Sequence, residues 1–246
     1  RFDDAAPYYA AALWGKSGEV SFTTAQQTSE NVGEAPGVNA YDKVDSETDE
    51  ILSYDFEDGL SDKSANEYDA ENGKNAEVKD GELVLKGGES YISTPLDKVG
   101  PEKELSFDIT LTQPAEPGQI LFEAEKDEDH EAYSTHNIRI MEDGTLGFTR
   151  EGYDYSFGYK LPVNQKMTLK IRTKNGSTVL IADGKEYKAT GSFTYEGDVK
   201  KTGITSSTLS LPLTRIGSDT NAVHAIIDNV NLSSTMSDGE SSPIDP

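Results

Sequence analysis

The middle of the chain alternates apolar and polar residues in the way that is typical of paired β-strands. Met167, Leu169 and Ile171 are separated by single polar residues, and this period of two places the apolar side chains on one face of a strand. The dipeptides Asn175-Gly176 and Asp183-Gly184 follow, eight residues apart. Both dipeptides favour the positive φ angles of two-residue hairpin turns. The stretch therefore predicts three consecutive antiparallel strands.

Similar short strands and turns are predicted from residue 51 almost to the end of the chain. No stretch between them has the spacing of a helix, which argues for an all-β fold of the sandwich or jelly-roll kind. The predicted strands outside the central stretch are residues 76–78, 82–85, 90–93, 104–112, 119–125, 137–141, 145–149 and 223–232.

The first fifty residues have a different pattern. Apolar residues fall at helical spacing before a glycine that ends the run, namely Phe2, Ala6, Tyr9, Ala10, Leu13 and then Gly15. Residues 39–50 are polar and acidic with no apolar period, so we interpret them as a linker. We therefore expect a helical segment and linker over residues 1–50, a β-domain over 51–233, and a polar tail over 234–246.

Charge narrows the choice of partners. The 246 residues include 22 Lys and Arg against 45 Asp and Glu, which gives a net charge of −23. Such a chain repels nucleic acid and anionic membrane surfaces, and no apolar run is long enough to insert into a bilayer. The chain has no cysteine, which excludes disulfides and thiolate metal sites. A neutral or cationic partner is therefore expected.

The opening run RFDDAAPYYAAALWG resembles the last helix of the catalytic barrel in family 20 glycoside hydrolases. These are N-acetylhexosaminidases and lacto-N-biosidases, and Ser29 to Asn39 resembles the short segment that follows their barrel. The resemblance implies an upstream catalytic domain, whose Asp-Glu pair lies before Arg1, and a secreted or cell-surface bacterial protein. It also implies that this part of the chain is not itself catalytic.

The β-domain resembles the concanavalin A-like jelly rolls of the laminin-G-like, lectin and glucanase group. The resemblance rests on Y-D-F-E-D-G-x-x-D-x-S-x-N at Tyr54 to Asn66, T-V-L-I-A-D-G at Thr178 to Gly184, and I-I-D-N-V-N-L at Ile226 to Leu232. Members of this group bind sugars, bind proteins, cleave glycans or support a neighbouring domain, so the fold alone does not select a function. Two functions remain open, a carbohydrate-binding accessory domain and a structural spacer on the catalytic domain.

An aromatic run provides the first candidate site. Tyr153, Tyr155, Phe157 and Tyr159 are spaced by two, which aligns the four rings along one face of a strand. Exposed rings at Tyr153 and Tyr155 would stack on a sugar, with Asp154 and Arg150 bonding to its hydroxyls. The expected ligand is a glycan that contains N-acetylhexosamine or galactose. The alternative is that the rings pack in the core.

A structural calcium ion is the second candidate. If the last strand alternates regularly, Asp228 lies on the same face as Ile226 and Val230, where a buried carboxylate needs a cation or hydrogen-bond donors. The jelly-roll resemblance implies that the first and last strands are neighbours, which would bring Asp228 near Asp55, Glu57 or Asp58. Oxygen ligands of this kind suit calcium, and loop amides are the alternative partners.

A catalytic alternative rests on three glutamates. The glucanase relatives carry E-x-D-x-x-E on one strand, and the nearest match is Glu123, Glu125 and Glu128. Alternation would place Glu123 and Glu125 on one face. However, Lys126 and Asp127 replace the apolar residues of that motif, so the sequence favours an acidic loop over a jelly-roll glycanase.

Overall fold

The computed structural model describes residues 50–126, 135–195, 199–204 and 207–235. The helix and linker predicted over residues 1–50 therefore lie outside the described residues, except for Glu50, and so does the polar tail from residue 236. In the described residues all the regular structure is β-strand, which confirms the all-β prediction. No helix in that part is long and apolar enough to cross a membrane.

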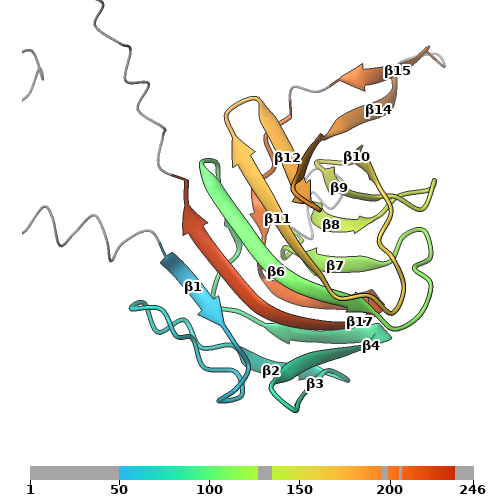
Figure 1. Ribbon diagram of the computed structural model, residues 1–246. Coiled ribbons are helices and arrows are strands. Elements are labelled where there is room, and N and C mark those ends of the chain that lie inside the picture. Colours follow the sequence, from blue (N-terminus) through green and yellow to red (C-terminus); the bar gives the residue numbers. More distant parts are fainter. Residues whose placement is uncertain (1–49, 127–134, 196–198, 205–206, 236–246) are drawn as a thin grey trace, which may run out of the picture. The chain divides into compact units, whose positions relative to one another are not determined.

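The strands follow one another at short intervals along the chain (Figure 1). They are β1 (Glu50–Tyr54), β2 (Glu71–Lys74), β3 (Glu77–Lys79), β4 (Glu82–Ser93), β5 (Lys98–Val99), β6 (Lys103–Leu111), β7 (Ile120–Glu123), β8 (His136–Ile140), β9 (Leu146–Arg150), β10 (Tyr153–Tyr159), β11 (Met167–Lys174), β12 (Ser177–Ala182), β13 (Lys185–Lys188), β14 (Thr190–Tyr195), β15 (Val199–Ile204), β16 (Leu211–Pro212) and β17 (Arg215–Ser234).

The last strand, β17, joins the two halves of the sheet. Figure 1 shows it as the long curved strand between β6 and β4. It pairs antiparallel with β1, β4, β6 and β7, so the first and last strands are neighbours, as the jelly-roll resemblance implied. From β17 the strand order runs through β6, β11, β12 and β13 on one side, and through β7, β8, β9, β10, β14 and β15 on the other.

The two halves of the sheet pack on each other as the layers of a sandwich. Phe107 of β6 and Phe122 of β7 belong to strands that are not paired, yet their rings meet edge to face with centroids 4.9 Å apart. Both rings are fully buried in one apolar cluster that takes side chains from both layers. Burial of this apolar surface is the main stabilising term of the fold.

The central meander has the predicted form. β11, β12 and β13 are joined by the turns Asn175-Gly176 and Asp183-Gly184, and each pairs antiparallel with the next. At the second turn Asp183 and Gly184 have φ angles of 52° and 70°, as a type I′ hairpin requires. Met167, Leu169 and Ile171 are all buried, so the predicted inward face is also correct.

Glycine allows β17 to pass close to β4. Gly217 has a φ of 99°, and a Cβ atom at this position would lie 2.1 Å from the carbonyl oxygen of Ser90. A side chain here would therefore force the two strands apart. The pairing of β17 is irregular around this point, between residues 218 and 222 with β4 and between residues 216 and 222 with β7. This irregularity lies beside the candidate site described next.

Candidate ligand-binding face

A row of polar side chains crosses five adjacent strands. The strand register aligns one residue from each of β17, β7, β8, β9 and β10, and we call this set the polar row: Arg215, Glu123, Asn137, Thr149 and Asp154. Directly opposed residues in antiparallel strands project to the same side of the sheet. The next residue along each strand, such as Phe122, Ile138 or Phe148, belongs to the apolar core. The polar row therefore points away from the core.

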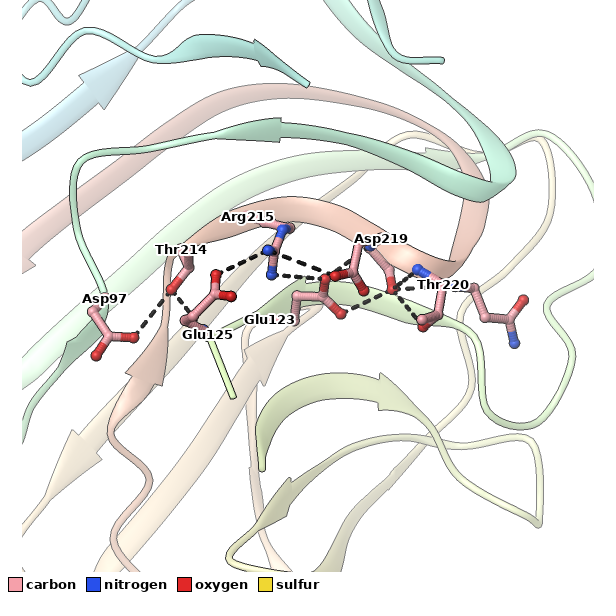
Figure 2. Close-up of polar contacts among 9 residues, drawn as sticks. Asp97, Glu123, Glu125, Thr214, Arg215, Asp219 and Thr220 are labelled. Atoms are coloured by element: carbon pink, nitrogen blue, oxygen red, sulfur yellow. Dashed lines mark hydrogen bonds and ion pairs between the residues drawn. The ribbon is translucent and has the colours of Figure 1, made fainter. Parts of the chain in front are cut away.

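At one end of the polar row a buried carboxylate has several hydrogen-bond donors (Figure 2). Glu123 is only 5 % exposed. Its side chain accepts hydrogen bonds from the Ser218 hydroxyl (2.9 Å), the Asp219 backbone N–H (2.8 Å) and the Arg215 guanidinium (3.4 Å). Burial raises the pKa of Glu123, and the hydrogen bonds from Asp219 and Ser218 offset part of that rise.

The guanidinium of Arg215 is shared among several acidic groups. Besides Glu123 it contacts Glu125 at 2.9 Å and Asp219 at 3.6 Å, as Figure 2 shows. It also lies 5.3 Å from the centre of the Tyr91 ring, within the range of a cation–π contact. One guanidinium cation thus contacts three carboxylates. At this end of the polar row the charged groups have partners, and negative charge is in excess.

The centre of the polar row is different, because it contains polar atoms without partners. The Asn137 side-chain oxygen, Oδ1, is buried without a hydrogen bond, and so is the Nε of Arg139, two residues further along the same face of β8. Asn137 is 5 % exposed. A buried polar atom without a partner costs on the order of 1–3 kcal/mol. Native proteins contain few such atoms, and a missing ligand or water is a usual explanation.

Asp154 lies beside these unpaired atoms. One of its oxygens accepts a hydrogen bond from the Thr149 hydroxyl at 2.5 Å, and the other lies 3.7 Å from Nη2 of Arg139. The side chain of Asp154 is 44 % exposed and that of Arg139 is 23 % exposed, so this part of the face reaches solvent. Asp154 is thus the solvent-facing neighbour of Arg139, on the face where Nε of Arg139 and Oδ1 of Asn137 are buried without partners.

The predicted aromatic site does not form one surface. Tyr153 is 44 % exposed, but Tyr155 is only 8 % exposed and belongs to the core. The Tyr155 ring stacks on the Phe148 ring, with the ring centroids 4.9 Å apart. It also lies close to the backbone of Gly191, where a Cβ atom would be only 2.5 Å from the Tyr155 ring. The prediction that Tyr155 presents its ring to a sugar is therefore wrong, because both protein contacts hold the ring inside the sandwich.

The polar residues predicted to accompany the rings also separate. Arg150 pairs with Tyr153 across a hairpin turn and lies on the core side of the sheet edge, where it donates to the Thr208 carbonyl at 2.8 Å. Asp154 points to the opposite face, since neighbouring residues of a strand alternate. Of the predicted sugar contacts, only Asp154 belongs to the polar row. Arg150 and Tyr153 share the other face of the hairpin.

The predicted calcium ligands are not brought together. Asp228 forms an ion pair with Lys166 at 3.0 Å, and Lys166 also contacts Asp108 at 3.3 Å. Asp55 and Asp58 instead share Lys63. Glu57 lies near Gly81, because a Cβ atom on that glycine would be 2.7 Å from its carboxylate. In the described ranges no three His, Cys, Asp or Glu side chains form a group that could hold a metal ion. These residues do not fit a calcium site.

A break in the alternation of β17 explains why Asp228 lies elsewhere. Ala225 and Ile227 are buried, and so are Val230 and Leu232, which means that the inward face changes parity between residues 227 and 230. Asn229 has a φ of 50° at this point, and the pairing with β6 shifts there. An inserted residue of this kind moves the side chains that follow to the other face. Asp228 therefore points outward, and the predicted shared face with Val230 is wrong.

The glutamates of the catalytic alternative have structural contacts. Glu123 and Glu125 lie on one face, as alternation predicted, and both bind Arg215. Glu128 lies outside the described residues. The sequence analysis did not predict three residues that define this face in the structure, namely Arg215, Asn137 and Arg139. A usable signal was present, because Asn137 and Arg139 alternate with the buried Ile138 and Ile140 in β8.

Comparison with known proteins finds no family for the chain and several solved structures that are similar at low sequence identity. No protein-family profile and no curated protein sequence matches the chain. Domain 4 of AbnA, a GH43 extracellular arabinanase from Geobacillus stearothermophilus in complex with arabinotriose, is 19 % identical over 76 % of this chain and 93 % of that chain, with a TM-score of 0.48.

Two larger proteins contain a similar domain. Trypanosoma rangeli sialidase is 14 % identical over 80 % of this chain and 35 % of that chain, with a TM-score of 0.49. Botulinum neurotoxin type C, whose cell entry depends on interaction with two ganglioside molecules, is 13 % identical over 75 % of this chain and 47 % of that chain, with a TM-score of 0.50. The chain thus spans less than half of either protein. The likeness concerns the fold, and none of these three is a family 20 glycoside hydrolase.

Proposed function

We propose that this chain contains a non-catalytic glycan-binding domain that binds a sugar on its polar row, between Asn137 and Asp154. The observation that carries the proposal is that Oδ1 of Asn137 and Nε of Arg139, two residues apart on one face of β8, are both buried without a partner. A folded protein retains such a pair at a cost in stability, and that cost is understandable where a ligand supplies the missing hydrogen bonds.

Sugar hydroxyl groups suit this pair of atoms. A hydroxyl both donates and accepts, so one sugar can donate to Asn137 Oδ1 and accept from Arg139 Nε. Asp154 adds a carboxylate at the solvent-exposed side. Recognition of this kind combines a few placed polar groups with a pre-formed surface on a rigid sheet.

Two of the similar structures are described together with a glycan. Arabinotriose is named with the arabinanase domain and gangliosides are named with the neurotoxin. In the proposal, the glycan contains N-acetylhexosamine or galactose, and residues 1–50 connect the domain to a catalytic domain of a secreted or cell-surface glycosidase. Arabinotriose provides a chemically distinct probe.

The spacer function is less well supported than binding. A domain that only packs on a neighbour needs a contiguous apolar surface. Among the residues whose side-chain exposure the structure describes, which leaves out residues 192–206, Tyr153 and Val163 are the only large hydrophobic side chains that are exposed. The described surface therefore offers polar recognition rather than an apolar docking patch.

A glycan array probed with the full chain tests the proposal. We expect binding to at least one neutral oligosaccharide, with loss of that signal in Asn137→Leu, which replaces the amide by an apolar group of similar shape. Asn72→Leu is the control, because Asn72 is an exposed residue of β2. An array with no bound glycan would contradict the proposal, and so would an Asn137→Leu signal equal to that of the unmodified chain. The second result would indicate that Asn137 holds only a water molecule.

A further inference from the structure

The charges that surround the polar row are mostly negative. Arg215 contacts three carboxylates, those of Glu123, Glu125 and Asp219, and Arg139 lies 3.7 Å from Asp154. Two guanidinium groups therefore face four carboxylates, within a chain whose net charge is −23. Neither guanidinium carries an unbalanced positive charge that an anionic ligand could neutralise.

The unpaired acceptor adds a second barrier to anions. Asn137 Oδ1 needs a hydrogen-bond donor, and an ionised carboxylate or sulfate has none. Such a group placed near Arg139 Nε would also lie near the carboxylate of Asp154. Like charges at this range repel by about 1 kcal/mol in water and by more where water is excluded, which corresponds to at least about a fivefold loss of affinity.

From these contacts we infer that the polar row selects uncharged glycans and rejects those that carry a carboxylate or a sulfate. This inference rests on the proposed glycan-binding function and names its substrate class. Asn137 accepts from a sugar hydroxyl, Arg139 donates to the same sugar, and Asp154 provides the selectivity. The ligand preference of this face therefore differs from recognition of a sialylated glycan.

An array of matched glycans tests the selectivity, with each neutral oligosaccharide printed beside its sialylated and sulfated forms. At about 20 mM NaCl we expect the acidic member of each bound pair to bind about fivefold to tenfold more weakly. The difference should shrink at about 300 mM NaCl, because salt screens exposed charges. Equal or tighter binding of the acidic members would overturn the inference while the proposed function stands. Absence of binding to every glycan would overturn both.

A single substitution tests the role assigned to Asp154. Asp154→Asn keeps an oxygen that can accept from the Thr149 hydroxyl but removes the charge. We expect the ratio of acidic to neutral affinity to rise about fivefold at low salt. Glu186→Gln is the matched control, since it removes one carboxylate from β13, in the other layer, where its partner is Arg172. An unchanged ratio in Asp154→Asn, or an equal rise in Glu186→Gln, would contradict local selection by Asp154.

Discussion

The Arg215 end and the centre of the polar row differ in how completely their polar atoms are paired. Around Arg215 the buried carboxylate of Glu123 accepts from a hydroxyl, a backbone N–H and a guanidinium. Around Asn137 the buried Oδ1 has no donor and the neighbouring Nε of Arg139 has no acceptor. The first group lies on β17 and β7 and the second on the adjacent β8, on the same face of the sheet.

This difference separates a structural role from a binding role. A buried charge network with all its partners in place stabilises one arrangement of the strands, and it leaves nothing for a ligand to add. Unpaired buried atoms lower stability unless something else completes them. We therefore assign the Arg215 end to the architecture of the β7–β17 pair and the centre around Asn137 to ligand recognition.

The largest expected effect is on stability, and it should differ between the core face of β10 and its exposed end. Tyr155→Ala removes a ring that is packed between Phe148 and Gly191, so we expect a loss of about 3 to 5 kcal/mol in the free energy of unfolding. Tyr153→Ala removes a ring that is 44 % exposed and should cost much less. Urea unfolding of the two variants measures both values. Equal losses would contradict the burial of Tyr155 in the core.

The next effect tests the satisfied end of the polar row. Arg215→Ala leaves the carboxylate of Glu123 buried without its cation, and removal of one partner from a buried pair typically costs about 3 to 5 kcal/mol. Because Ser218 and Asp219 still donate to Glu123, we expect a loss of about 3 kcal/mol in the free energy of unfolding. Glu125→Gln removes an exposed partner of the same arginine and should cost under about 1 kcal/mol. An Arg215→Ala protein that is as stable as the parent would contradict the structural role of Arg215.

A smaller effect concerns pH. Burial raises the pKa of Glu123 above its ordinary value of 4.5, so the folded protein holds this proton more tightly than the unfolded chain does. The associated stability is present below the unfolded pKa and is lost as pH rises through the folded pKa. We therefore compare the unfolding free energies of the parent and Glu123→Gln at about pH 7 and at about pH 4. Relative to the variant, the parent should be more stable at the lower pH than at the higher one.

Urea unfolding at the two pH values measures this shift, and Glu125→Gln provides the control for removal of a neighbouring exposed carboxylate. A difference between the parent and Glu123→Gln that is the same at both values would mean that the folded state does not raise this pKa.

The sequence was sufficient to predict much of the fold. The alternation in β11 and the dipeptide Asp183-Gly184 are local signals, and local signals decide strand faces and hairpin turns. The alternation of apolar and polar residues gave the wrong face in β17, because the sequence does not mark Asn229 as the residue that breaks the alternation. One inserted residue was enough to move Asp228 from the predicted inner face to the outer face.

The candidate site was harder to predict than the fold. Asn137 and Arg139 have the alternation of a half-polar strand, but their importance depends on which residues β7, β9 and β10 place beside them. These partners are distant in sequence, and hydrogen-bond satisfaction is visible only once the register is known. The aromatic run was more conspicuous, yet the alternation of β10 could not tell that Tyr155 is enclosed while Tyr153 extends beyond the core.

One measurement tests the central claim most directly, the combined stability and glycan affinity of Asn137→Leu. Since the substitution removes an unpaired buried oxygen, we expect the free energy of unfolding to stay level or rise by about 1 kcal/mol. Titration calorimetry with a glycan that binds the unmodified chain should detect at least about a tenfold loss of affinity in the same variant. A variant that is less stable and binds that glycan as tightly as the parent would contradict the account, because Asn137 would then serve the fold rather than the ligand.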